Sequence, residues 1–141
     1  MVNNRFFMTE LYELTMANGY FEKGYKDQIA YFDMFFRKNP SDNGYSVCAG
    51  LEQVIDYIKN LHFTYDDVVY LRKLGIFSEE FLNYLSGFHF SGDIFAIPEG
   101  TVVFPGEPLI TVKAPIIEAQ IIETILLIFL NSNIFYYYLY I

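Results

Sequence analysis

Tryptophan is absent from this 141-residue sequence, cysteine occurs once, and charged residues make up only 18% of it. The lone Cys48 excludes an internal disulfide, and its apolar neighbours predict a buried, inert thiol. Basic residues are scarce, with 9 against 17 acidic ones, and the net charge of −8 disfavours binding to nucleic acid. Residues 1–8 lack the apolar stretch and cleavage site of a secretory signal. We therefore expect a cytoplasmic protein.

Local catalytic signatures are also missing. The sequence has no glycine-rich nucleotide loop, no nucleophile elbow and no cysteine–histidine cluster with metal-ligand spacing. His62 and His89 are isolated, each beside a phenylalanine, and we interpret both as packed structural residues. The acidic pairs 66–67 and 79–80 lie where helices are expected to begin, and we assign them to favourable interaction with the helix dipole.

Apolar material is abundant, with 53% hydrophobic and 20% aromatic residues. This excludes a disordered chain and predicts either a dense core or a surface that something else covers. Periodicity predicts a helix from Thr9 to about Asn18, ended by Gly19, and further helices from Gly50, Thr64 and Ser78. A strand buried on both faces is expected at 28–36, a second at 45–49, and short strands between 88 and 113. A nearly all-apolar helix at 116–130 should be covered by a larger protein or by lipid.

Two side chains are candidates for binding. Tyr12 lies on the first predicted helix, where its ring can stack on a flat ligand, although by residue type alone an ordinary helix-face tyrosine is favoured. Arg37 ends an apolar strand and enters a loop of proline, asparagine and glycine. A guanidinium there can bind a phosphate through two hydrogen bonds. Arginine at a strand end is also often merely solvated, so both interpretations of Arg37 stay open.

Several blocks of the sequence together resemble the start of bacterial-type nicotinate phosphoribosyltransferases. They stand in the family's order and spacing from residue 9 to about 127, and their joint occurrence is specific although no single block is decisive. One departure is Glu10, where the family usually has aspartate. The blocks are Thr9–Met16 with Gly19–Tyr20, Phe32–Pro40, Ala49–Gln53, Tyr70–Phe77, Phe90–Ile94, Ile97–Thr101, Ala114–Gln120 and Glu123–Thr124.

The resemblance implies a reaction in which nicotinate and phosphoribosyl pyrophosphate give nicotinate mononucleotide and pyrophosphate. ATP hydrolysis, with Mg²⁺, drives this entry step of NAD salvage. The fold implied is the α+β or α/β N-terminal domain of a type II phosphoribosyltransferase, with the first helix of an irregular α/β barrel. Two subunits of a homodimer build each site head to tail. Tyr12 is then expected to stack on the pyridine ring in the partner subunit's site, and Arg37 to contact the phosphates of phosphoribosyl pyrophosphate.

The match to the family is lost at about residue 128. We expect an N-terminal domain at 1–127 and an aberrant hydrophobic tail at 128–141, with the barrel itself missing, as in a truncated or frameshifted chain. The family's phosphorylatable histidine, a later ring-binding arginine and the phosphate loops of the barrel have no counterpart here. His62 and His89 do not match that histidine. We therefore expect no catalytic residue, no metal site and no activity in this chain alone.

Two other interpretations remain open. A non-catalytic chain could associate with a full-length subunit through an exposed apolar helix at 116–130. Alternatively, the chain could attach to a membrane through residues 121–141, which are long enough to span a bilayer. Glu123 and the polar residues 131–133 would make that span costly, so we expect membrane attachment to be the less favoured of the two.

Overall fold

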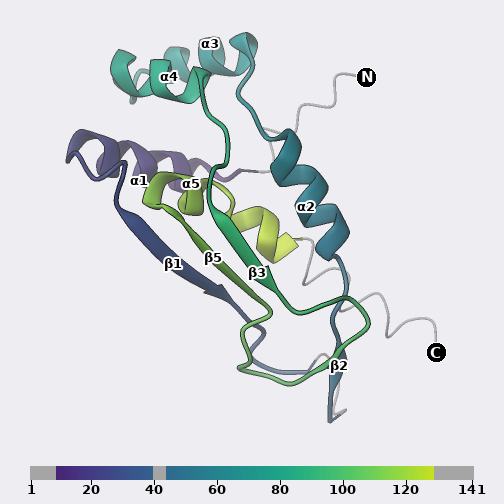
Figure 1. Cartoon of the computed structure of the whole chain (residues 1–141). Coiled ribbons are helices and arrows are strands. Elements are labelled where there is room, and N and C mark those ends of the chain that lie inside the picture. Colours follow the sequence, from purple (N-terminus) through teal and green to yellow (C-terminus); the bar gives the residue numbers. More distant parts are fainter. Residues whose placement is uncertain (1–8, 40–43, 129–141) are drawn as a thin grey trace.

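The computed structural model describes residues 9–39 and 44–128, which form helices packed on a small antiparallel sheet (Figure 1). The predicted mixed α+β class is confirmed. The predicted tail at 128–141 lies, except for its first residue, outside the described residues. In chain order the elements are α1 (Leu11–Glu22), β1 (Ile29–Met34), β2 (Ser46–Val47), α2 (Leu51–Asn60), α3 (Tyr65–Leu74), α4 (Glu79–Ser86), β3 (Asp93–Ala96), β4 (Val102–Val103), β5 (Ile110–Pro115) and α5 (Ile116–Ile121).

The central strand of the main sheet is β5, which pairs antiparallel with β1 on one side and β3 on the other. Helices α1 and α5 pack on each other and lie over one face of this sheet (Figure 1). The prediction that β1 is buried on both faces is wrong. Ile29, Tyr31 and Asp33 are exposed, whereas Met34 is buried. Alternate residues of a strand point to opposite faces, and only one face is covered by helices in the part described.

The first helix is longer than predicted. It continues past Gly19 to Glu22, and the chain turns at Gly24, whose φ of 75° suits glycine. Residues beyond Gly19 keep the helix going because the Tyr20 and Phe21 rings pack against the core. The N-cap is Glu10 rather than the predicted Thr9. Its backbone N–H donates to the side chain of Glu13, 3.2 Å away, a reach-back bond that fixes the start of the helix.

Three further helix starts were predicted correctly, and local chemistry explains each. Thr64 and Ser78 cap α3 and α4, their hydroxyls accepting backbone N–H bonds from the third helical residue. Gly50 precedes α2 with a φ of 102°, a value that L side chains rarely adopt. The side chain of Glu99 accepts the N–H of Gly50 at 2.8 Å, which satisfies one free donor at the start of α2.

The structure describes residues 116–128 of the predicted helix at 116–130, and this part is interrupted. Element α5 ends at Ile121, Ile122 is a turn, and residues 123–128 are helical again. Ile117, Ile121 and Ile125 are 0% exposed, because the sheet and α1 already bury them, whereas Leu127 and Ile128 are 41% and 39% exposed. The expectation that this helix needs cover from another protein or from lipid is therefore wrong for residues 116–126. In the described ranges, each helix is too short or too polar to cross a bilayer.

A close contact ties β3 to β5. A Cβ added to Gly92 would lie 2.4 Å from the Cβ of Ala114 and 2.7 Å from the carbonyl oxygen of Lys113, so only glycine fits. The neighbouring Ser91 donates its N–H to the Glu118 carboxylate at 2.6 Å, and its hydroxyl also bonds that carboxylate. This buried carboxylate on α5 therefore holds the start of the third strand.

Candidate functional site

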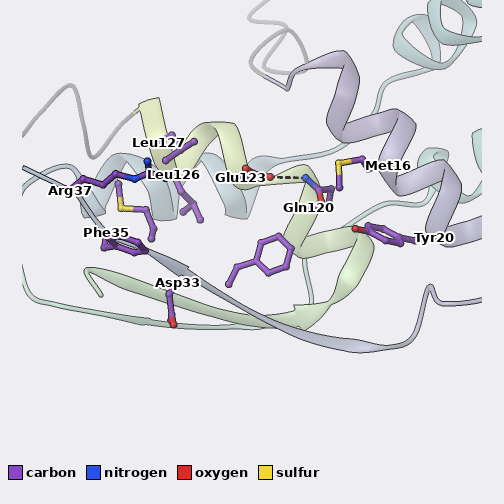
Figure 2. A pocket seen from close by; sticks show the side chains of 11 residues that line it. Met16, Tyr20, Asp33, Phe35, Arg37, Gln120, Glu123, Leu126 and Leu127 are labelled. Atoms are coloured by element: carbon purple, nitrogen blue, oxygen red, sulfur yellow. Dashed lines mark hydrogen bonds between the residues drawn. The ribbon is translucent and has the colours of Figure 1, made fainter. Parts of the chain in front are cut away.

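An open cavity of about 460 Å³ lies between α1, β1 and the helical segment that follows α5 (Figure 2). Its walls are mainly apolar and aromatic, and Arg37 and Glu123 supply charge. Concave, mostly apolar sites with a few charged groups are typical of small-molecule binding. Asp33 also lines the cavity, but its carboxylate accepts a hydrogen bond from the Thr111 hydroxyl at 2.6 Å.

Arg37 lies where β1 gives way to a loop, and its exposed side chain extends over the cavity beside Leu126 and Leu127 (Figure 2). The backbone just before it is fixed, because the carbonyl of Phe36 accepts the N–H of Gly106 at 2.9 Å and Phe36 itself is buried. Among residues 9–39 and 44–128, Arg37 has no ion-pair partner. The backbone at Phe36 therefore places Arg37 at the cavity, where its guanidinium can donate hydrogen bonds to an anion.

Tyr12 does not line the cavity, although it shares a face of α1 with two residues that do. Met16 and Tyr20 follow it at intervals of four residues, and both contribute to the cavity wall. The Tyr12 phenol lies close enough to Thr124 and Glu123 for both residues to affect its pKa. Burial raises the pKa of the phenol, and the nearby Glu123 and Glu13 carboxylates raise it further. The residue is still 42% exposed, so much of its ring is open.

Glu123 belongs to the surroundings of both predicted binding residues, Arg37 and Tyr12. It lines the cavity together with Arg37, and its negative charge lies near enough to the Tyr12 phenol to raise the pKa of that group. Its carboxylate also accepts a hydrogen bond from the Gln120 side chain at 2.7 Å (Figure 2). The structure thus brings Arg37 to the cavity and places Tyr12 one helical turn beyond Met16 at its edge, near Glu123 of the cavity wall.

Glu13 lies in the first turn of α1 and was not singled out from the sequence. The residue is 0% exposed. One carboxylate oxygen accepts both the N–H of Thr124 at 2.7 Å and its hydroxyl at 2.6 Å. Burial raises the pKa of Glu13 to about 7, although these hydrogen bonds favour the ionised form. The only sequence signal was a carboxylate in the middle of an apolar helix face.

The histidines, the cysteine and the acidic pairs lie outside this site. His62 and His89 are not packed as predicted but exposed, and each ring bonds a backbone carbonyl two residues earlier. Cys48 is buried as predicted, and burial together with Glu99 raises the pKa of its thiol. The acidic pairs do begin α3 and α4. Within the described residues, no group of three His, Cys, Asp or Glu side chains could hold a metal ion.

The fold is shared with solved structures. It matches the crystal structure of human nicotinic acid phosphoribosyltransferase with a TM-score of 0.84 and 30% identity, over 89% of this chain and 26% of that one. A nicotinate-nucleotide pyrophosphorylase from Pyrococcus furiosus matches at a TM-score of 0.64 over 92% of this chain and 26% of that one. Because the two sequences are only 18% identical, this match shows the fold alone. The fold of this domain therefore occurs in the human nicotinic acid phosphoribosyltransferase structure.

Sequence comparison gives the family. Residues 7–131 match the model of the nicotinate phosphoribosyltransferase (NAPRTase) N-terminal domain, and the chain belongs to this family. The nicotinate phosphoribosyltransferase pncB2 of Mycobacterium tuberculosis is 48% identical over 119 residues, which are 84% of this chain and 26% of the relative. The Bacillus subtilis enzyme is 44% identical over 123 residues, 87% and 25% of the two chains. The chain thus spans about a quarter of the length of these relatives.

Proposed function

We propose that this chain supplies the N-terminal domain for a nicotinate phosphoribosyltransferase reaction. In that reaction, nicotinate and phosphoribosyl pyrophosphate give nicotinate mononucleotide and pyrophosphate, with ATP hydrolysed. One observation carries the proposal: Arg37 lines an open cavity without an acidic partner among the described residues, in a domain of this family. We assign no residue of this chain to ATP or Mg²⁺, since the described residues contain no suitable metal-binding cluster.

Two contacts with substrates follow. Arg37 would bind phosphate oxygens of phosphoribosyl pyrophosphate, because its planar guanidinium can donate two parallel hydrogen bonds. The exposed ring of Tyr12 would stack on the pyridine ring of nicotinate in the site of a partner subunit, which requires a homodimer. Through these two contacts the domain would bind and orient the substrates.

The first experiment tests Arg37 in a chimaera. Residues 7–131 of this chain replace the matching quarter of the Mycobacterium tuberculosis relative, and formation of nicotinate mononucleotide is measured. Arg37→Ala should raise the KM for phosphoribosyl pyrophosphate about ten- to a hundredfold, as expected for a lost charged hydrogen bond. Lys38→Ala, an exposed neighbouring cation outside the cavity, is the matched control and should change little. An unchanged KM in Arg37→Ala would contradict the phosphate role.

The same chimaera tests Tyr12. Tyr12→Ala should raise the KM for nicotinate about three- to tenfold, the usual worth of one aromatic stacking contact. Tyr31→Ala removes a ring that is 65% exposed on β1, outside the cavity, and serves as the control. Equal effects of the two substitutions would argue against stacking by Tyr12. For the 141-residue chain assayed alone we expect no turnover, because the residues that match its relative make up only 26% of that relative.

A further inference from the structure

The helix that begins at Ile116 breaks at Ile122, and a side chain from α1 makes hydrogen bonds at the break. In an uninterrupted helix the N–H of Thr124 would donate to the carbonyl oxygen of Gln120, four residues earlier. That carbonyl oxygen instead accepts the N–H of Ile122, and the N–H of Thr124 donates to the Glu13 carboxylate at 2.7 Å. A side chain that takes an N–H away from the helix ladder is a known cause of such a break.

The apolar Ile122 cannot cap the helical segment at 123–128 that follows it. The N–H of Leu126 donates to the carbonyl oxygen of Ile122 at 3.2 Å, so Ile122 stands at the N-cap position and Thr124 is the second helical residue. An N-cap side chain normally accepts the N–H of the second or third helical residue, and isoleucine has no atom that can do so. Glu13 accepts that N–H instead, although it is 111 residues away along the chain.

Thr124 is next to residues of the cavity wall. Glu123, Leu126 and Leu127 share one face of the segment because they lie three and four residues apart, and all three line the cavity (Figure 2). The Thr124 side chain is buried, and its hydroxyl donates at 2.6 Å to the same Glu13 oxygen as its N–H. Two bonds to one buried oxygen restrict both the place of the segment and its rotation about its own axis.

Glu13 is itself held in place at the start of α1. Its side chain is 0% exposed, and its second oxygen accepts the backbone N–H of Glu10 at 3.2 Å. One oxygen of the carboxylate is therefore anchored to α1 and the other to Thr124. A short buried side chain with both ends fixed sets the distance between α1 and the segment at 123–128.

We propose that Glu13 caps the segment at 123–128 from α1 and is thereby a positioning residue for the cavity wall next to Arg37. The effect on a substrate rests on the proposed function, whereas the capping does not. A buried N–H without an acceptor is costly, so without Glu13 the segment should turn until Thr124 finds another acceptor or water. The side chains that the segment presents to the cavity would turn with it. Because a neutral amide oxygen also accepts an N–H, the cap does not require a charge at Glu13.

Amide hydrogen exchange in the intact 141-residue chain tests the cap. Exchange at Thr124 is measured relative to exchange at Leu109, whose N–H donates to the carbonyl oxygen of Met34, so that a general loss of stability cancels. Glu13→Met keeps a side chain of similar length but removes both oxygens, and Thr124 should then exchange about tenfold faster. Glu13→Gln keeps one oxygen and should retain the wild-type rate. Glu22→Met, the same change at an exposed carboxylate of α1, is the matched control and should leave the rate unchanged.

Residual dipolar couplings of the same chains test the positioning. In the wild type and in Glu13→Gln, the N–H bonds of residues 123–128 should fit the same alignment as those of α1. In Glu13→Met they should require a different orientation or be reduced by averaging. Both variants lose the bond from the Glu10 N–H, because neither methionine nor the glutamine NH2 group offers an oxygen there. The difference between the two variants therefore reports the bonds to Thr124 alone.

A folded Glu13→Met chain with the exchange rate and dipolar couplings of the wild type would overturn the proposal. If that variant does not fold, Glu13→Asp decides, because its carboxylate is one methylene shorter; wild-type couplings and exchange in that variant would equally count against the cap. A Thr124 amide that exchanges as fast as a free amide in the wild-type chain would overturn the proposal without any variant. The proposed function fails separately, if Arg37→Ala leaves the KM for phosphoribosyl pyrophosphate unchanged in the chimaera, and the positioning by Glu13 then stands without that ligand.

Discussion

The buried carboxylate of Glu13 should make the stability of this domain depend on pH in an unusual direction. Its pKa is raised from 4.5 to about 7 in the folded state. Between these two values the unfolded chain has lost the proton while the folded chain still holds it. Raising the pH through this window therefore favours unfolding. The loss begins near pH 4.5 and is complete somewhat above pH 7, which is opposite to the behaviour of a salt-bridged carboxylate.

The size of the effect follows from the same pKa values. At about 1.4 kcal/mol for each pKa unit, the whole window corresponds to about 3 kcal/mol of unfolding free energy. Measurements should avoid the isoelectric point of 4.6. Between pH 5.5 and pH 8 the Glu13 contribution should fall by about 2 kcal/mol. That is a large share of the stability of an ordinary small domain.

Urea unfolding followed by circular dichroism at several pH values provides the assay. Glu13→Gln cannot ionise, and its amide oxygen can still accept both bonds from Thr124, so its stability should lack this pH-dependent loss. The difference in unfolding free energy between the wild-type chain and Glu13→Gln should fall by about 2 kcal/mol between pH 5.5 and pH 8. Glu52→Gln, an exposed carboxylate on α2, is the control and should track the wild type. Parallel pH profiles for the wild type and Glu13→Gln would refute the reasoning.

Two further predictions concern stability alone. Gly92→Ala should destabilise the chain by about 1–3 kcal/mol or more, because the added methyl would overlap Ala114 and the backbone of Lys113. Gly87→Ala is the control, because the nearest atom to its added methyl would be 3.9 Å away. Equal urea midpoints for the two variants would count against the close packing of β3 on β5. Thr64→Ala should cost about 1–2 kcal/mol through loss of the α3 cap, whereas Ser86→Ala at an exposed helix end should stay within about 0.5 kcal/mol.

The parts of the fold that sequence patterns predicted are those decided by near neighbours. The starts of α3 and α4 could be predicted because a cap needs only a hydroxyl and an N–H three residues away. The end of α1 was misjudged because Gly19 normally favours a helix end, and only the packing of Tyr20 and Phe21 overrides that preference. Strand β1 was misjudged because its run of apolar residues does not reveal how many faces the helices cover.

The residues of the candidate site can likewise be divided into those whose role the sequence could predict and those whose role it could not. The chemistry available to Arg37 followed from its place at a strand end, and the structure adds the cavity that it faces. The role of Glu13 could not be predicted, because its partner Thr124 is 111 residues away along the chain. From the sequence, Glu123 stood out only as a charge that makes a membrane span costly and as part of a block that resembles the family. Its position near Tyr12 depends on how α1 and α5 pack, whereas its hydrogen bond from Gln120 is a local contact three residues back along the chain.

The order of strands in the sheet has a consequence for how the chain folds as it is synthesised. Strand β5 is the last strand of the described chain, yet both β1 and β3 pair with it and not with each other. Ile29 can form its strand pair only after Pro115, its partner in the register, has been synthesised. Such distant pairings slow folding and prolong the exposure of apolar surface. In the nascent chain, β1 therefore lacks its partner strand, and α1 lacks α5, until nearly the whole domain has been synthesised. During that time the chain should depend most on chaperones.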